Sequence, residues 1–146
     1  MKFGIIKVES EDDLNACLEI REKVFIEEKG VPREIENDKY DCLRDDCEHF
    51  LVSYDGQPVG TVRVRALDDK TVMLQRFCFL RQCRGLGLGA KTVESIGKRC
   101  KNLGKTKIVV EAKYSASPFY EKCGFMAVSD IFCEVGVKHI KMEKEI

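Results

Sequence analysis

The sequence predicts one α/β (α+β) domain, residues 1–146, in which a mixed, mostly antiparallel sheet of six to seven strands is flanked by helices. The length of 146 residues suits one ordinary domain. Before residue 80, strand-like segments follow one another with turn signals between them, which favours antiparallel pairing. After residue 80, a helical segment separates two strand-like segments, and this order favours a parallel pair with a right-handed crossover.

The first half of the chain is expected to form a strand, a helix and three more strands. Ser10 can cap the helix, and the acids at positions 11–13 suit the positive end of the helix dipole. Asp55-Gly56 favours a hairpin turn between two of the strands. The expected strands are residues 3–8, 49–54, 59–65 and 72–80, and the expected helix is residues 11–28.

The second half is expected to form two helices and three strands. A long amphipathic helix follows a glycine-rich turn and ends at Gly104. Ser117 supplies an N-cap and Pro118 a first-turn proline for a short helix, which ends at Gly124. The expected strands are residues 108–110, 125–133 and 138–143, and the short helix is residues 119–123.

The charge and hydropathy of the whole chain argue against two classes of partner. The chain has 25 basic and 25 acidic residues, so its net charge favours neither nucleic acid nor an anionic membrane surface. No apolar run approaches the roughly 18 residues of a membrane span, and the first residues lack the apolar core of a signal peptide. We therefore expect a cytoplasmic protein that binds neither nucleic acid nor membrane.

Eight cysteines raise the question of disulfides or a metal site. Disulfide frameworks belong mainly to short secreted chains, so reduced thiols are expected here. Cys42 and Cys47 are separated by four residues, as are Cys78 and Cys83, and the chain contains no Cys-x-x-Cys pair. This spacing does not favour zinc, and no metal is expected.

Charge is unevenly distributed along the chain. Residues 27–48 contain nine acids and four bases, whereas residues 81–107 contain eight bases and Glu94 as their one acid. Each stretch can be an ordinary solvated surface. The alternative is a cation-attracting rim in the first stretch and an anion site in the second.

The segment Leu80–Ala90 is the most informative part of the sequence. Its glycines, Gly85, Gly87 and Gly89, allow the backbone to turn tightly and approach a ligand, and the helix that follows offers unpaired N–H groups. Such a turn can hold a pyrophosphate. It lacks the Gly-x-x-x-x-Gly-Lys-Ser/Thr pattern of a P-loop, and the antiparallel strands expected before it do not fit a dinucleotide-binding fold.

Two segments resemble a known family. Arg84-Gly85-Leu86-Gly87-Leu88-Gly89 resembles the Arg/Gln-x-x-Gly-x-Gly/Ala signature of the GNAT superfamily of acetyl-CoA-dependent N-acetyltransferases, and Ser117–Phe125 resembles the second diagnostic element of that family. Other segments, among them Arg21–Phe25 and Gly136–Met142, are similar to the small ElaA-like branch. The resemblance covers nearly the whole chain and implies the GNAT fold.

The resemblance implies acetyl-CoA (coenzyme A) as co-substrate. Backbone amides of residues 86–90 would bind the pyrophosphate, and Arg81, Arg84 and Lys91 would favour the 3′-phosphate. The pantetheine arm would pair with the backbone of residues 77–80. The implied cofactor-binding residues are Phe77, Cys78, Phe79, Arg84, Gly85, Leu86, Gly87, Leu88, Gly89, Ala90, Ser117 and Tyr120.

In the implied reaction, the protein holds acetyl-CoA and the acceptor together in a ternary complex. The primary amine of the acceptor, which is a small molecule or a peptide, attacks the thioester directly. Tyr120 would protonate the departing thiolate, although a tyrosine at this spacing can also be a packed aromatic. Many relatives carry a glutamate base in the fourth strand, where this chain has Gln75 and Arg76. The candidates to replace that base are His49, His139 and Glu111.

Three further expectations follow from these patterns. Residues 27–48 would line the acceptor side and favour cationic amines such as polyamines or amino sugars. A homodimer can form through strands near the carboxyl end, as the resemblance implies. Because the strand glutamate is missing, the alternative to an enzyme is a non-catalytic acyl-CoA-binding or regulatory module on the same fold.

Overall fold

The computed structural model describes residues 2–146, which form eight strands and four α-helices. The chain divides into two compact units. The first contains the described residues up to Arg65 together with Arg76–Thr92, and the second contains Ala66–Gln75 and Val93–Ile146. Among residues 2–146, no helix is long and apolar enough to cross a bilayer.

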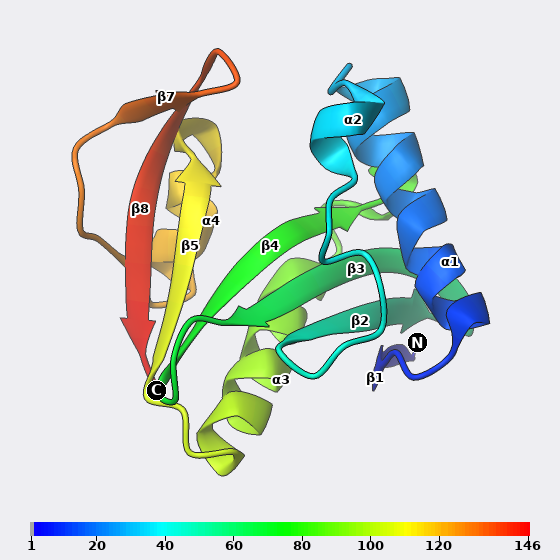
Figure 1. Ribbon diagram of the computed structural model, residues 1–146, viewed down its shortest axis with the longest axis horizontal. Helices are drawn as coiled ribbons and strands as arrows, with labels where there is room; N and C mark the ends of the chain where they lie inside the picture. The colour runs from blue at the N-terminus through cyan, green and yellow to red at the C-terminus, as the bar shows by residue number, and fades with distance from the viewer. Residues whose placement is uncertain (1) are drawn as a thin grey trace. The chain divides into compact units, whose positions relative to one another are not determined.

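The first unit is built on an antiparallel sheet (Figure 1). Strands β1 (Phe3–Lys7), β2 (Cys47–Tyr54) and β3 (Gln57–Ala66) pair in that order. Strand β4 (Thr71–Phe79) is the next neighbour of β3, and just beyond it the Leu80 amide donates to the Val59 carbonyl at 2.8 Å. Asp55 and Gly56 both have positive φ, at 50° and 82°, as the predicted hairpin turn requires.

Helix α1 (Glu11–Arg21) covers one face of this sheet and begins as predicted. The Ser10 hydroxyl accepts a hydrogen bond from the Asp13 amide at 3.2 Å. The apolar stripe of α1 packs against residues of β2 and β4 and forms a core with them. The members of this core are Val8, Leu14, Cys17, Ile20, Val24, Leu51 and Cys78. The predicted helix over residues 11–28 is continuous, but its last seven residues form a π-helix, η1 (Glu22–Glu28).

The opposite face of the first unit's sheet is covered by the start of α3 (Leu88–Asn102). Leu88 is buried against Val52 and Val59, with the partly buried rings of Phe3 and Phe79 beside them. Side chains alternate between the two faces of a strand, so Leu51 faces α1 while Val52 faces Leu88. This packing fixes the point at which the glycine-rich turn enters the helix.

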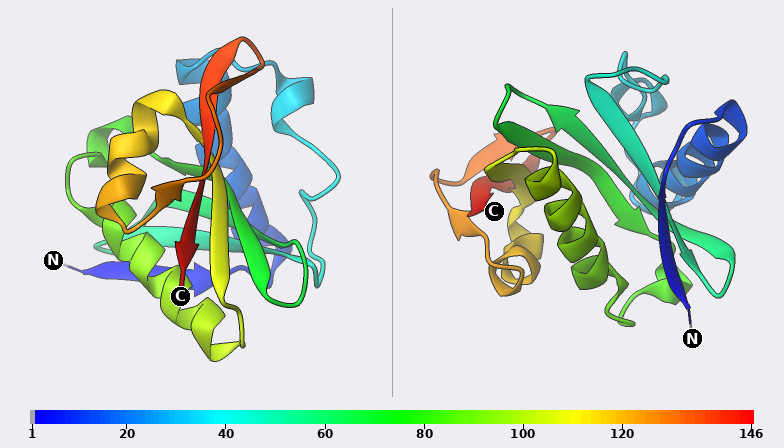
Figure 2. Two further views of the ribbon diagram at one scale, coloured as in Figure 1. Left: turned by 90° about the vertical axis from the view of Figure 1, so that its left-hand side faces the viewer. Right: turned by 90° about the horizontal axis from the view of Figure 1, so that it is seen from below.

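The second unit contains the predicted parallel pair. Residues Thr71–Leu74 of β4 run parallel to β5 (Lys107–Lys113), with Val72 opposite Ile108. Strand β8 (Val137–Glu145) pairs antiparallel with β5, and β6 (Met126–Ala127) and β7 (Phe132–Glu134) both pair with β8 (Figure 2). The remaining elements are the 3-10 helix η3 (Tyr114–Ala116) and α4 (Ser117–Lys122).

Two local predictions in the second unit were wrong in detail. The strand expected over residues 125–133 is broken into β6 and β7, because four residues separate Ala127 from Phe132 while only two separate their partners Met142 and His139. Val128 still donates its amide to the Lys141 carbonyl at 2.9 Å, but the extra residues interrupt the pairing, so the described sheet has eight strands rather than six or seven. Ser117 is the first residue of α4 rather than its cap, and its hydroxyl donates to the Tyr114 carbonyl at 2.8 Å.

Candidate active site

The turn between β4 and α3 has the backbone that its glycines predict. After a 3-10 helix, η2 (Arg81–Cys83), Gly85 and Gly87 adopt left-handed φ values of 81° and 78°. A Cβ atom added at either glycine would meet no atom within 4 Å. The main chain of the turn is therefore open on the side where a side chain would stand, and the first N–H groups of α3 follow directly.

Arg84 lies at the entrance of this turn and is held by two partners. Its guanidinium donates to both carboxylate oxygens of Glu28, each at 2.7 Å, and to the Phe79 carbonyl at 3.1 and 2.9 Å. These hydrogen bonds lower the pKa of Glu28 to about 2, so the pair stays ionised at neutral pH. Arg84 thus ties the turn to the end of η1. Arg81 and Lys91, which are exposed beside the turn, can contribute positive charge toward an anion bound there.

The side chains of the last residues of β4 are buried or packed to different degrees. Cys78 is buried, and burial raises the pKa of its thiol to about 12, so the thiol stays protonated and is a poor nucleophile at neutral pH. The ring of Phe79 lies over Gly60, where an added Cβ would come within 2.4 Å of it. Phe77 lies beside Phe79 with their ring centroids 5.7 Å apart.

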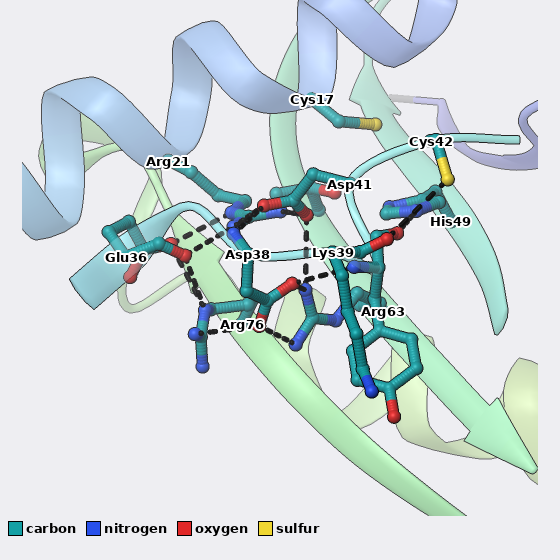
Figure 3. Close-up of polar contacts among 12 residues, drawn as sticks. Cys17, Arg21, Glu36, Asp38, Lys39, Asp41, Cys42, His49, Arg63 and Arg76 are labelled. Carbon is teal, nitrogen blue, oxygen red and sulfur yellow. Dashed lines mark hydrogen bonds and ion pairs between the residues drawn. The ribbon is translucent and has the colours of Figure 1, made fainter. Parts of the chain in front are cut away.

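A buried ion-pair network holds the acidic stretch of the first unit (Figure 3). Its guanidinium groups are mostly inaccessible, since the side chains of Arg21 and Arg63 are each 2% exposed. Arg21 binds Glu36 at 2.8 Å and Asp41 at 2.6 Å. The other pairs are Arg63 with Asp38 at 2.7 Å and with Asp41 at 3.0 Å, and Arg76 with Glu36 and with Asp38 at 3.3 Å each.

This network changes the interpretation of residues 27–48. Glu36, Asp38 and Asp41 are each paired with arginines, and Glu28 is paired with Arg84. Paired carboxylates attract a passing cation weakly, because the neighbouring guanidinium cancels their charge. This part of the stretch is a scaffold held by arginines, and Glu36, Asp38 and Asp41 contribute little to the cation-attracting rim expected for residues 27–48.

His49 supports the same scaffold from β2. Its ring is 2% exposed, and Nε2–H donates to the Tyr40 carbonyl at 2.9 Å. Burial lowers the pKa of His49, so the ring is neutral at neutral pH. A buried ring committed to a carbonyl is poorly placed to take a proton from an amine.

In the second unit, Tyr120 is enclosed by aromatic rings. It is 7% exposed and makes edge-on contacts with Phe119 and Phe125, whose ring centroids lie 5.1 and 5.3 Å away. Burial raises the pKa of its hydroxyl, which therefore keeps its proton well above neutral pH.

Glu111 and His139 lie on neighbouring strands of the second unit. Glu111 is exposed on β5, opposite Lys141 of β8. The Nδ1–H group of His139 donates to the Val137 carbonyl at 2.8 Å, and the ring stacks on Phe132. Its Nε2 lies 3.9 Å from a carboxylate oxygen of Glu134. Among residues 2–146, no group of three or more His, Cys, Asp or Glu side chains is placed to hold a metal ion.

Comparison with known proteins decides the family. Residues 19–146 match the family model of the acetyltransferase (GNAT) domain. The chain is a GNAT acetyltransferase. It is 35% identical to the N-acetyltransferase YjcF of Bacillus subtilis over 147 residues, covering 99% of this chain and 100% of YjcF.

Solved structures share its fold. The crystal structure of Escherichia coli ElaA superposes with a TM-score of 0.84 at 25% identity and covers 99% of both chains. A GNAT acetyltransferase from Elizabethkingia anophelis, solved with acetyl-CoA bound, has a TM-score of 0.68 at 16% identity and covers 99% of this chain and 98% of its own. The GNAT fold predicted from the sequence, with its similarity to ElaA, is confirmed.

Sequence reasoning missed the ion-pair network, although one signal was available. Arg21 occupies a position on the apolar stripe of α1, four residues after Cys17 and three before Val24. Arg63 stands between two buried valines of β3. A charged residue at a core position needs a buried partner, but the sequence does not say which acid supplies it.

Replacing Arg21 tests the network. Arg21→Ala would leave Glu36 and Asp41 buried without their partner, and we expect it to lower the free energy of unfolding by about 3–5 kcal/mol. Urea denaturation measures this loss. Arg33→Ala, which removes an exposed pair with Glu22, is the matched control and should change little. Equal losses in the two variants would contradict a structural role for the network.

His49 predicts a pH dependence of stability. Because burial lowers its pKa in the folded state, the unfolded chain takes up the proton first. The free energy of unfolding should therefore fall as the pH drops from 7 through the ordinary histidine pKa of about 6.5. His49→Gln should flatten this part of the curve, and His139→Gln should retain it. Urea titrations at several pH values measure the slope, and an unchanged slope in His49→Gln would refute the assignment.

Proposed function

We propose that this acetyltransferase transfers the acetyl group of acetyl-CoA to a primary amine on a small molecule or a peptide. The observation that carries the proposal is the open, left-handed backbone at Gly85 and Gly87, directly before the first turn of α3. Backbone N–H groups in such a turn suit a pyrophosphate. The exposed side chains of Arg81 and Lys91 flank the turn and add positive charge.

The residues that would hold the co-substrate follow from this geometry. The N–H groups of residues 86–90 would bind the pyrophosphate, and Arg81 and Lys91 would favour the 3′-phosphate. Arg84 positions the turn through Glu28. Because Arg84 already occupies the Phe79 carbonyl, the backbone of residues 77 and 78 is the better partner for the pantetheine arm. Bound acetyl-CoA supplies an activated acetyl thioester.

Tyr120 is proposed as the general acid. The hydroxyl carries a proton at neutral pH, and this is the proton that would go to the departing thiolate. The rings of Phe119 and Phe125 hold the side chain in one place. Ser117, one turn earlier in α4, is proposed to help order the pantetheine arm.

Glu111 is the base that the geometry favours among the three candidates. Its carboxylate is exposed, so it can accept a proton from an ammonium group directly or through water. His49 is buried against the Tyr40 carbonyl. In His139, Nδ1 is occupied by the Val137 carbonyl and Nε2 faces Glu134.

A homodimer is also proposed, through the carboxyl-terminal strands. Exposed apolar side chains gather on β6, β8 and the segments between the last strands, and they are Met126, Val128, Ile131, Val135 and Val137. Apolar side chains in such number on one segment are typical of an interface.

The turn is tested by Gly87→Val. A valine at a φ of 78° is strained, and its side chain would fill the space proposed for the pyrophosphate. We expect the Kd for coenzyme A, measured by calorimetry, to rise at least about tenfold while circular dichroism shows a folded protein. Gly97→Val, in open space within α3, is the control and should bind coenzyme A normally. Normal binding by Gly87→Val would refute the turn as the site.

Catalysis is tested by Tyr120→Phe. The phenyl ring preserves the packing but removes the proton, so we expect kcat to fall about 10²–10⁴-fold with little change in the KM for acetyl-CoA. Thiol release over a panel of amines measures the rate. Tyr114→Phe, at an exposed tyrosine, is the control. Coenzyme A binding without turnover in the wild type would favour the non-catalytic acyl-CoA-binding module, which the missing strand glutamate also allows.

A further inference from the structure

Arg76 has an unusual conformation in β4. Its φ is 53°, in the left-handed region that arginine rarely adopts, although it lies inside the strand. Such local strain persists only where surrounding contacts hold it, and it is common at functional sites. Arg76 directly precedes Phe77, where the backbone proposed for the pantetheine arm begins.

One edge of the Arg76 guanidinium is held by the segment around α2 (Arg33–Glu36). Its Nε donates to the Glu36 carbonyl at 3.1 Å, and its Nη2 donates to the Ile35 carbonyl at 3.4 Å and to Asp38 at 3.3 Å. Nε also lies 3.3 Å from a carboxylate oxygen of Glu36. These contacts fix the plane of the group.

The other edge of the guanidinium is available to a ligand. Within residues 2–146, Nη1 of Arg76 has no hydrogen-bond partner, and the side chain is 26% exposed. In Figure 3 this end of Arg76 points away from the carboxylates that hold the rest of it. A guanidinium fixed in this way can bind an anionic oxygen without first losing side-chain freedom.

The surrounding charges favour an anion at this position. The three carboxylates of the ion-pair network also serve the buried Arg21 and Arg63. Burial lowers the pKa of Arg76, while Glu36 raises it and Arg63 and Arg21 lower it. Because three guanidinium groups share the three carboxylates, every carboxylate of the network is already paired, and none of them is left to repel an anion at Nη1.

More cations stand at the edge of the network, around the ring of Tyr40. The charged groups of Lys39, Arg44 and Arg65 lie 5.3, 5.0 and 4.8 Å from its centroid, and Arg63 also approaches it at 5.4 Å. The Nε of Arg65 is buried and has no partner among the residues that the structure describes. A polyamine approaching here would meet paired carboxylates and the cationic groups around Tyr40.

We propose that Arg76 binds a carboxylate of the acceptor through Nη1, so that the acceptor is an amine that also carries a carboxylate, such as an amino acid, rather than a polyamine. This inference rests on the proposed function, in which the pantetheine arm runs from the glycine turn back along β4 toward Phe77. The acetyl end then lies toward Arg76, and an acceptor amine that attacks it brings its own substituents to the guanidinium.

The experiment compares each of the twenty amino acids with its amide, and includes spermidine as the cationic competitor. At low salt, the best amino acid should have a kcat/KM roughly ten- to hundredfold above that of its amide, as expected for a hydrogen bond to a charged group. Arg76→Gln should abolish this preference, and Arg76→Lys should keep part of it. Lys98→Gln, at an exposed lysine paired with Glu94 in α3, should keep all of it.

A binding measurement separates recognition from catalysis. The N-acetyl form of the best amino acid is titrated calorimetrically into protein saturated with coenzyme A, and Arg76→Gln should weaken its binding about tenfold. Lys98→Gln, which removes an exposed positive charge in α3, should retain binding, and thermal melts confirm that each variant is folded.

The outcomes distinguish this inference from the proposed function. Turnover in which amides or spermidine equal or exceed the amino acids, or a preference that survives Arg76→Gln, overturns the role of Arg76 and leaves acetyl transfer intact. Failure of the folded protein to bind coenzyme A overturns the proposed function and this inference with it.

Discussion

Burial of two guanidinium groups is the constraint on which the first unit depends. Arg21 and Arg63 lie in the interior, where an unpaired charge would be very costly. They therefore require carboxylates, and the segment after η1 supplies Glu36, Asp38 and Asp41. A stretch of sequence with little periodicity is in this way fixed over the sheet, and with it the Tyr40 carbonyl that binds His49.

Arginines in this unit serve two different purposes. Arg84 lies in the motif expected to bind phosphate, but its donors are directed to Glu28 and to the Phe79 carbonyl. It therefore shapes the turn, while the anion would be bound by main-chain N–H groups and more exposed cations. Arg76 would combine both purposes. One edge of its guanidinium holds the segment around Glu36 and Asp38, and the other edge is the one proposed to bind an anion. The π-helix contributes to this arrangement because it ends at Glu28.

Burial also sorts the groups that can exchange protons. Tyr120 and Cys78 are enclosed by apolar surroundings and keep their protons at neutral pH. His49 is also buried, and its imidazole ring stays neutral because burial disfavours the doubly protonated, cationic form. The exposed carboxylate of Glu111 is a different kind of group, open to water. A general acid and a general base need such different surroundings, because each must hold the opposite protonation state at the same pH.

The sequence by itself determined the order of the elements, the parallel pair β4–β5, the hairpin at Asp55-Gly56 and the glycine turn before α3, because periodicity, turn residues and glycine conformation are local properties. It did not determine the break between β6 and β7, the partners of Arg21 and Arg63, or the Glu28–Arg84 pair. These depend on strand register and on which charges meet after residues far apart in the chain are brought together, as Arg84 and Glu28 are across 56 positions. Only the tertiary structure decides such pairs, since any of the nine acids in residues 27–48 offers the same carboxylate to a buried arginine.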